Sequence, residues 1–429
     1  GYRLFFIIVM ACCAIMHPFI HPFIFQKKNI FSRKVRFCFA NIIGAMESER
    51  RNTKCYKFPN QAFQDLRSVA SLTSEPDYFK AKYGRLLSLL NTEIPEGLLS
   101  TLVQFYDPVF HCFTFPDYQL VPTLEEYSFC MGIPVSDIVP FSGPDEPIQK
   151  QQIAKALHMG LAEIPITVKG NIEGIAAEFL QDQAVRFSKI GCIDGHHAHL
   201  ALLIYGLILF PNIENFVDMN AIKIFLNGNP VPTLLGDALH SIHHRTLKGG
   251  GKINCCVPLL YQWYNAHLPK HSLFRDNPNQ LRWSQRIMSL RAEDISWFFP
   301  GADSEGLIDG CGEFMNVPLI GRYGGINYHP ALARRQAALA MKKKPENIYL
   351  ENIYFLHEGN EILRRRITHA WNRIHRRRRD TLGKRDCTAY EPYNIWIRER
   401  ACTLKMPYPP EAASIATFPP PITPTFSPS

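Results

Sequence analysis

Residues Leu200–Phe210, LALLIYGLILF, form the segment that most constrains the fold, because they are apolar on every side. A helix of this kind must be covered by protein or lipid all the way round. Eleven residues are too few to span a bilayer, which takes about 20. We therefore expect a central core helix inside a body large enough to surround it. The 429 residues, of which 46% are hydrophobic, supply enough material for that core.

Helix signals are frequent elsewhere and strand signals are few. Thr123 and Glu126 form a capping box that predicts a helix ending at Gly132. We also expect an amphipathic helix over Asn171–Lys189 and a helix capped by Asp194 that runs through Phe210. The predicted strands are Phe113–Phe115, Val317–Ile320 and Tyr349–Phe355. The predicted fold is therefore mainly α, a multi-helix globular body with a few short strands.

The sequence divides into three parts. Residues 1–45 are an apolar and basic leader, residues 46–405 are the body, and residues 406–429 are a Pro-rich tail that we expect to be disordered. The leader contains Leu4–Phe25, which carries no formal charge. Three interpretations stay open for it: sequence translated upstream of a natural start at Met46, a transmembrane anchor that leaves the body in the cytoplasm, or a targeting peptide.

Positive charge is concentrated at two places. The net charge is +9, of which residues 1–45 hold +6 and residues 364–385 hold +9, so the remaining chain sums to −6. Because the rest of the body is mildly acidic, any binding of a polyanion is expected at the C-terminal stretch.

Residues 360–379 are predicted to form one basic helix that ends the body. Leu363, Ile367, Ala370, Trp371 and Ile374 recur at helical spacing and would dock on the body. The arginines would form a cationic ridge on the helix, made of Arg364, Arg365, Arg366, Arg373, Arg376, Arg377, Arg378 and Arg379. Their spacing suits a bipartite nuclear import signal, their guanidinium groups suit nucleic-acid phosphates, and a merely solvated helix face is the third interpretation.

No motif announces a chemistry. His196 with His199, and His240 with His244, have helical spacings at which two side chains can share a metal ion, but no recognised set of further ligands accompanies them. The chain also lacks Asp-Thr-Gly, Asp-Ser-Gly, Asp-Asp and Cys-x-x-Cys, so the protease, polymerase and zinc-knuckle motifs of mobile elements are absent. We predict no catalytic residue and no cofactor.

Several blocks together resemble the plant mobile domain group, transposon-associated plant proteins once labelled "aminotransferase-like", and in particular its legume-rich branch of uncharacterised domains. The most specific block is FPDYQLVPTLEEY within Phe105–Pro134. The other blocks are Leu200–Asp218, Asn229–Arg245, Gly249–Leu268, Cys311–Gln336 and Ala370–Arg379. The resemblance implies a mostly helical domain carried by retrotransposons and by domesticated relatives linked to nuclear silencing, with no catalytic residues to carry over.

We therefore expect a non-enzymatic, transposon-derived nuclear interaction module with weak affinity for nucleic-acid phosphates. Its expected partners are nucleic acid or chromatin proteins and an import receptor, with a membrane only if residues 4–25 are native. Two alternatives stay open. One is a metal- or Cys-dependent hydrolase that uses the histidine pairs, and the other is a membrane-anchored protein of unknown role.

Overall fold

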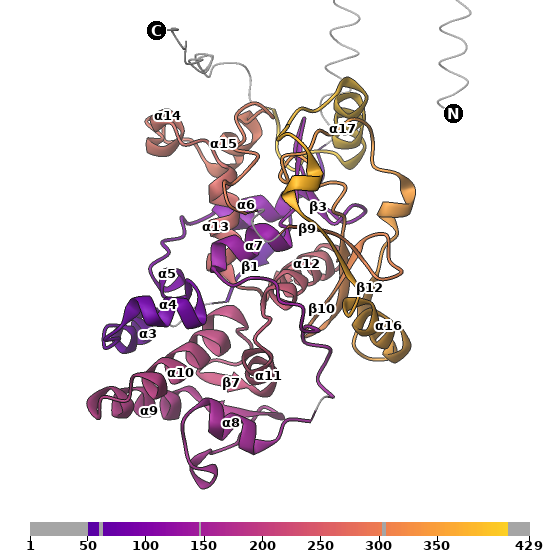
Figure 1. The fold of residues 1–429 in the computed structure, drawn as a ribbon. Helices are drawn as coiled ribbons and strands as arrows, with labels where there is room; N and C mark the ends of the chain where they lie inside the picture. Colours follow the sequence, from indigo (N-terminus) through magenta and orange to yellow (C-terminus); the bar gives the residue numbers. More distant parts are fainter. Residues whose placement is uncertain (1–49, 60–62, 146, 303–305, 411–429) are drawn as a thin grey trace, which may run out of the picture. The chain divides into compact units, whose positions relative to one another are not determined.

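The structure is a computed structural model, and it describes residues 50–59, 63–145, 147–302 and 306–410. The chain divides into two compact units, Gly1–Arg50 and Arg51–Ser429, and all the described helices and strands belong to the second (Figure 1). The predicted leader and the predicted tail from residue 411 onward lie outside the described residues. No helix within the described ranges is long and apolar enough to cross a membrane.

The second unit is a mixed and mostly helical fold, so the predicted fold class is confirmed in outline. The α-helices are α3 (Phe63–Ala70), α4 (Pro76–Tyr83), α5 (Leu86–Leu90), α6 (Leu98–Leu102), α7 (Leu124–Met131), α8 (Lys150–Ala156), α9 (Ala177–Lys189), α10 (Ile193–Ile204), α11 (Met219–Asn227), α12 (Val231–Leu247), α13 (Val257–His267), α14 (Ser272–Asp276), α15 (Trp283–Ser289), α16 (Glu361–Trp371) and α17 (Glu391–Leu404). A π-helical turn, η4 (Tyr205–Leu209), extends α10, and short 3₁₀ turns occupy Val103–Phe105, Leu161–Glu163, Asn347–Leu350 and Arg379–Leu382.

The strands are short and pair into small sheets. They are β1 (Cys55–Lys57), β2 (Tyr106–Asp107), β3 (Cys112–Thr114), β4 (Gln119–Leu120), β5 (Thr167–Lys169), β6 (Ile172–Ala176), β7 (Phe216–Asp218), β8 (Gly250–Lys252), β9 (Leu307–Cys311), β10 (Val317–Gly321), β11 (Gly324–Tyr328), β12 (Tyr354–Leu356) and β13 (Ile374–Arg377). The described sheets have the orders β2-β3-β4, β5-β6-β7, β10-β11-β12, β13-β9 and β1-β8, and only β1-β8 is parallel. The predicted strands Phe113–Phe115 and Val317–Ile320 correspond to β3 and β10. The prediction Tyr349–Phe355 is wrong over its first residues, because Asn347–Leu350 is a 3₁₀ turn and only Tyr354 and Phe355 of the predicted range belong to β12.

The predicted capping box is confirmed at the start of α7. The Thr123 hydroxyl accepts from the Glu126 N–H at 3.1 Å, the Glu126 carboxylate accepts from the Thr123 N–H at 3.3 Å, and Gly132 ends the helix in the left-handed conformation. Glu126 also accepts from the Trp263 indole N–H at 2.8 Å. The cap is therefore tied into the core as well as to its own helix.

The apolar segment Leu200–Phe210 is buried along its whole length, as predicted. It belongs to α10 and η4, where the backbone widens into a π turn closed by the Phe210 N–H on the Tyr205 carbonyl at 2.9 Å. The prediction that Asp194 caps this helix is wrong. The helix begins at Ile193, and the Asp194 carboxylate instead pairs with the Lys82 ammonium at 2.8 Å.

The predicted helix Asn171–Lys189 is wrong over its first residues. Gly170 and Asn171 both have positive φ, +58° and +63°, and join β5 to β6 in a two-residue hairpin. Such turns match the natural twist of two antiparallel strands, so Ile172–Ala176 pairs with β5 instead of starting the helix. Only Ala177–Lys189 is helical.

Helix α12 packs closely against the β10-β11 hairpin (Figure 1). A Cβ atom on Gly236 would lie 3.2 Å from the Gly321 nitrogen, and one on Gly321 would lie 2.5 Å from the Asp237 carboxylate. The absence of both side chains lets the helix and hairpin touch along their backbones. At the tip of the hairpin, Arg322 pairs with Asp237 at 2.6 Å, and both side chains are 1% exposed.

The prediction of one basic helix over residues 360–379 is wrong in its second half. Helix α16 ends at Trp371, and Ile374–Arg377 forms strand β13. This strand pairs antiparallel with β9, with Ile374 opposite Cys311 and Arg377 opposite Leu307. The pairing joins segments more than 60 residues apart, so local helical periodicity could not reveal it. The predicted docking of Ile367, Ala370 and Trp371 is confirmed, because all three are buried.

Candidate functional site

The first predicted histidine pair lies on α10, and both side chains are buried. His196 donates through Nδ1 to the Ala184 carbonyl at 2.9 Å, and His199 donates through Nδ1 to the Gly195 carbonyl at 2.7 Å. His199 Nε2 lies 3.2 Å from the Met159 sulfur. Burial lowers the pKa of His199 to about 4, so its imidazole is neutral at pH 7.

The second predicted pair lies on α12 with parallel rings whose centroids are 6.1 Å apart. His240 donates through Nε2 to the Phe355 carbonyl at 3.2 Å, and His244 Nδ1 lies 2.7 Å from the Tyr354 hydroxyl. Across the described ranges, no group of three or more His, Cys, Asp or Glu side chains is placed to hold a metal ion. The two pairs therefore do not combine into a metal centre.

A third histidine group, made of His111, His243 and His329, was not predicted as a cluster. The His111 ring centroid lies 4.6 Å from that of His243 and 5.9 Å from that of His329. Burial lowers the pKa of His243 and of His329 to about 3. The three residues come from the β2-β3 turn, α12 and the end of β11, so only tertiary packing brings them together. They form a neutral polar part of the core.

Most arginines of the predicted ridge already have protein partners. Arg364 is mostly buried and pairs with Asp145 at 2.6 Å and with Glu361 at 2.9 Å. The other engaged pairs and contacts are Arg366 with Glu313 at 2.6 Å, Arg376 with Asp137 at 3.2 Å, Arg377 with Asp309 at 3.3 Å, and Arg379 with the Ala337 carbonyl at 3.2 Å. The segment is therefore bound to the body through its charges as well as through its apolar stripe.

Three exposed ridge arginines make no ion pair shorter than 3.9 Å with a described residue, whereas Arg366 is 57% exposed but paired with Glu313. Arg365 is 83% exposed and reaches Glu361 only at 3.9 Å. Arg373 and Arg378 are exposed and make no ion pair with any residue that the structure describes. The structure thus splits the predicted ridge into cations held by the fold and cations that face water.

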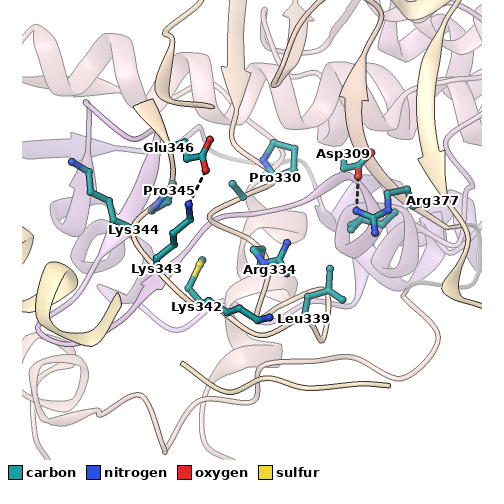
Figure 2. A pocket seen from close by; sticks show the side chains of 13 residues that line it. Asp309, Pro330, Arg334, Leu339, Lys342, Lys343, Lys344, Pro345, Glu346 and Arg377 are labelled. Carbon is teal, nitrogen blue, oxygen red and sulfur yellow. Dashed lines mark hydrogen bonds and ion pairs between the residues drawn. The ribbon is translucent and has the colours of Figure 1, made fainter. Parts of the chain in front are cut away.

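A pocket of about 300 Å³ lies beside strand β13, which we call the basic strand (Figure 2). Its apolar surface comes from Leu307, Pro330, Ala331, Leu339, Met341 and Pro345. Its charged residues are the cations Arg334, Lys342, Lys343, Lys344 and Arg377 and the carboxylates Asp309 and Glu346. We call this site the cationic pocket. Five positive side chains against two negative ones give it an excess of positive charge, and that surface attracts anions.

Two ion pairs stand on opposite sides of the cationic pocket. Lys343 pairs with Glu346 at 2.8 Å, and Arg377 pairs with Asp309 at 3.3 Å. Figure 2 shows the Arg334 and Lys342 side chains between these pairs, at the apolar surface. Lys342 and Lys344 are exposed and make no ion pair within the part of the chain that the structure describes.

The cationic pocket contains only one of the predicted site residues, Arg377. The run Lys342–Lys344 was visible in the sequence, but three lysines before a proline usually mark no more than a solvated loop. Their meeting with β9 and β13 depends on the folding of distant segments. Sequence reasoning therefore identified one side of the site and missed the other.

The nine described cysteines are all free. Burial raises the pKa of the Cys256 thiol to about 12 and that of Cys255 well above its usual value. Both thiols stay protonated at pH 7, and a protonated thiol is a poor nucleophile. These two side chains therefore give no support to a cysteine nucleophile.

A family model described as a domain of unknown function (DUF7745) matches residues 65–402. The matched range includes the cationic pocket, both histidine groups and the whole of α16 and β13. No curated protein and no solved structure matches the chain.

Proposed function

The chain belongs to the DUF7745 family, whose function is unknown, and we propose that it is a non-catalytic interaction module that contacts nucleic-acid phosphates weakly. The observation that carries the proposal is the positive charge of the cationic pocket, where Lys342–Lys344 and Arg334 meet Arg377 of the basic strand. Lysine and arginine side chains supply the electrostatic part of nucleic-acid binding, which is independent of sequence.

We further propose a nuclear location and a transposon-derived plant origin, as the resemblance to the plant mobile domain group implies. Chromatin proteins and an import receptor are the proposed protein partners. The exposed arginines Arg365, Arg373 and Arg378 support contacts with acidic partners, because their guanidinium groups face water. We also propose that the fold is mainly α, as the sequence predicted: a multi-helix globular body with a few short strands.

Binding through the cationic pocket should be non-specific in sequence. The lysine and arginine side chains around it are donors that suit phosphate oxygens, and lysine contacts phosphate as a point charge. Reading of base edges needs paired donors and acceptors held in a groove of the nucleic acid, and the pocket is concave. We therefore expect similar affinity for unrelated sequences and a strong dependence on salt.

The test is fluorescence anisotropy of the full chain with labelled oligonucleotides of unrelated sequence, between about 50 mM and about 200 mM salt. The variant Lys342→Gln/Lys343→Gln/Lys344→Gln should bind more weakly, and the slope of log affinity against log salt should fall by about 0.7 to 0.9 for each lost contact. The matched control, Lys80→Gln/Lys155→Gln/Lys189→Gln, removes the same charge from exposed lysines on α4, α8 and α9. The proposal would be contradicted if both variants weakened binding equally, or if the unmodified chain did not bind the oligonucleotides.

A further inference from the structure

We propose that the cationic pocket binds the terminal phosphate of a nucleic-acid strand, a phosphate monoester, in preference to the phosphodiesters along the strand. This inference rests on the proposed function and names the ligand class of the same site. Three properties of the pocket carry it: its concave shape, its charge, and the chemistry of its apolar surface.

The shape of the pocket favours a strand end. Residues of β9 and β13, together with residues 330–334 and 339–346, line a concave space of about 300 Å³, which is the size of a small-molecule site. A phosphodiester inside a strand has a sugar on each side, so the strand must bend sharply to bring that phosphate into a pocket. A terminal phosphate has a sugar on one side only and can enter without bending the strand.

The charge of the pocket also favours a monoester. Glu346 and Asp309 are each engaged by a lining cation, Lys343 and Arg377 respectively. Lys342 and Lys344 add positive charge and form no ion pair with a described carboxylate, although Asp386 lies near enough to Lys342 to interact with it through charge. A phosphate monoester carries about −1.5 to −2 at pH 7 and has three oxygens that accept hydrogen bonds. A diester carries one negative charge, so it gains less from the same cations.

The apolar surface limits what the rest of the ligand can be. Leu307, Ala331 and Leu339 are aliphatic, and none of the described residues that line the pocket is aromatic. Bases are commonly held by stacking on aromatic side chains, which this pocket does not offer. Aliphatic side chains suit the C–H face of the terminal sugar. The pocket should therefore recognise the phosphate and its sugar, whatever the base.

The experiment compares four labelled single-stranded probes of one sequence with the full chain. They carry a 5′-phosphate, a 3′-phosphate or no terminal phosphate, and the fourth is a closed circle without ends. We expect one of the two phosphorylated probes to bind about tenfold more tightly than the probe without a terminal phosphate, because its terminal phosphate makes a further charge-assisted contact. The variant Lys342→Gln/Lys344→Gln should lose this preference, and the matched variant Lys80→Gln/Lys155→Gln should keep it.

The outcomes separate this inference from the proposed function. Equal binding of all four probes, with salt dependence, would overturn the preference for ends and leave weak phosphate contact standing. Binding of none of them would overturn both. A phosphorylated peptide that binds more tightly than the phosphorylated oligonucleotides would show a phosphate-monoester site but overturn its assignment to nucleic acid.

Discussion

Helices α12 and α16 each carry a charged side chain that forms a close carboxylate–guanidinium pair, but the pair on α12 is buried and the pair on α16 is exposed. On α12, Asp237 pairs with Arg322 at 2.6 Å, and both side chains are 1% exposed. On α16, Arg366 pairs with Glu313 at the same distance, 2.6 Å, but the two side chains are 57% and 54% exposed. The distance between the two groups therefore does not distinguish an ion pair that stabilises the fold from one that contributes little at the surface. The exposed fraction of the two side chains does distinguish them.

The same contrast applies to function. Around α12 most polar groups are buried, and Asp237 and His240 are paired within the fold, although the Thr233 hydroxyl has no partner among the described residues. These buried groups can bind a ligand only if the fold opens. In the chain that follows α16, strand β13 pairs with β9, and there the segment Lys342–Lys344 leaves cations in water at the rim of the cationic pocket. Cations that face water can exchange solvent for an external anion at little structural expense. This difference is why the cationic pocket, and not the histidine-rich helix, is our functional site.

The largest effect is expected from breaking the buried pair with Asp237→Asn. Asp237 accepts from the Arg322 N–H at 2.7 Å and from its Nε–H at 2.6 Å, and Arg322 also donates to the Phe210 carbonyl at 2.6 Å. The amide would leave the buried guanidinium with its backbone carbonyl partners, but among the described residues only the Asp218 carboxylate, at 3.9 Å, would remain as a counter-charge. We expect the free energy of unfolding to fall by about 3–5 kcal/mol.

Urea denaturation followed by circular dichroism measures that change. The double variant Asp237→Leu/Arg322→Met removes both charges of the pair and should lose less stability than the single variant, because no buried guanidinium is left without its main counter-charge. The Asp218 carboxylate loses its contact with Arg322 but keeps the hydrogen bonds from the Asn212 amide and the Ala221 N–H. A single variant that loses less than about 1 kcal/mol would show that the buried pair does not differ from a surface pair.

A somewhat smaller effect is expected when acid charges the buried histidines. Burial holds the pKa of His199 and His240 at about 4 and that of His243 and His329 at about 3. An unfolded histidine has a pKa of about 6.5. Below that pH the unfolded chain binds more protons than the folded chain, so the free energy of unfolding decreases as the pH is lowered. At about pH 5.5 each histidine should remove about 1.4 kcal/mol relative to neutral pH.

Carboxylates whose pKa is raised by burial oppose this loss; they are Asp117, Glu125 and Asp237. Burial raises the pKa of Glu125 to about 7, so its folded form takes up a proton first and gains about 2 kcal/mol on the same change of pH. For these four histidines and Glu125 taken together, the expected net loss between about pH 7.5 and about pH 5.5 is about 3–4 kcal/mol, measured by urea denaturation at several pH values. His243→Gln should make the loss smaller by about one histidine's share, and a stability that rises on acidification would refute the neutral core.

Local and non-local features of this chain differ in how well the sequence predicts them. The cap at Thr123 and Glu126 depends on two side chains three residues apart, and the burial of Leu200–Phe210 follows from composition alone. Strand β13 depends on pairing with β9, so its arginines have helical spacing but no helix. The Gly170-Asn171 turn was a local signal that the helical periodicity after it outweighed.

The candidate site was less predictable than the fold. Of its charged residues only Arg377 belonged to the predicted ridge, because clustering of Arg334 and Lys342–Lys344 beside it requires three separate segments to meet. The histidines show the converse error. Their helical spacing suggested that each pair could share a metal ion. In the structure, His196, His199 and His240 each donate to a backbone carbonyl, and His244 contacts the Tyr354 hydroxyl. Spacing along a helix fixes which side chains are neighbours and leaves open what else they touch.

The smallest effect is expected from Glu313→Gln, the surface counterpart of Asp237→Asn. The Glu313 carboxylate accepts from both Nε and Nη2 of Arg366, yet both side chains are more than half exposed, so water and salt compete with the pair. The Arg366 guanidinium also lies 5.6 Å from the Phe314 ring and keeps that contact in the variant. We expect a loss of less than about 1 kcal/mol, and less still at high salt, in the same urea assay. If Glu313→Gln instead destabilises the chain as much as Asp237→Asn, then α16 is held by this pair, and the division between structural charges in the core and available charges at the surface fails for this protein.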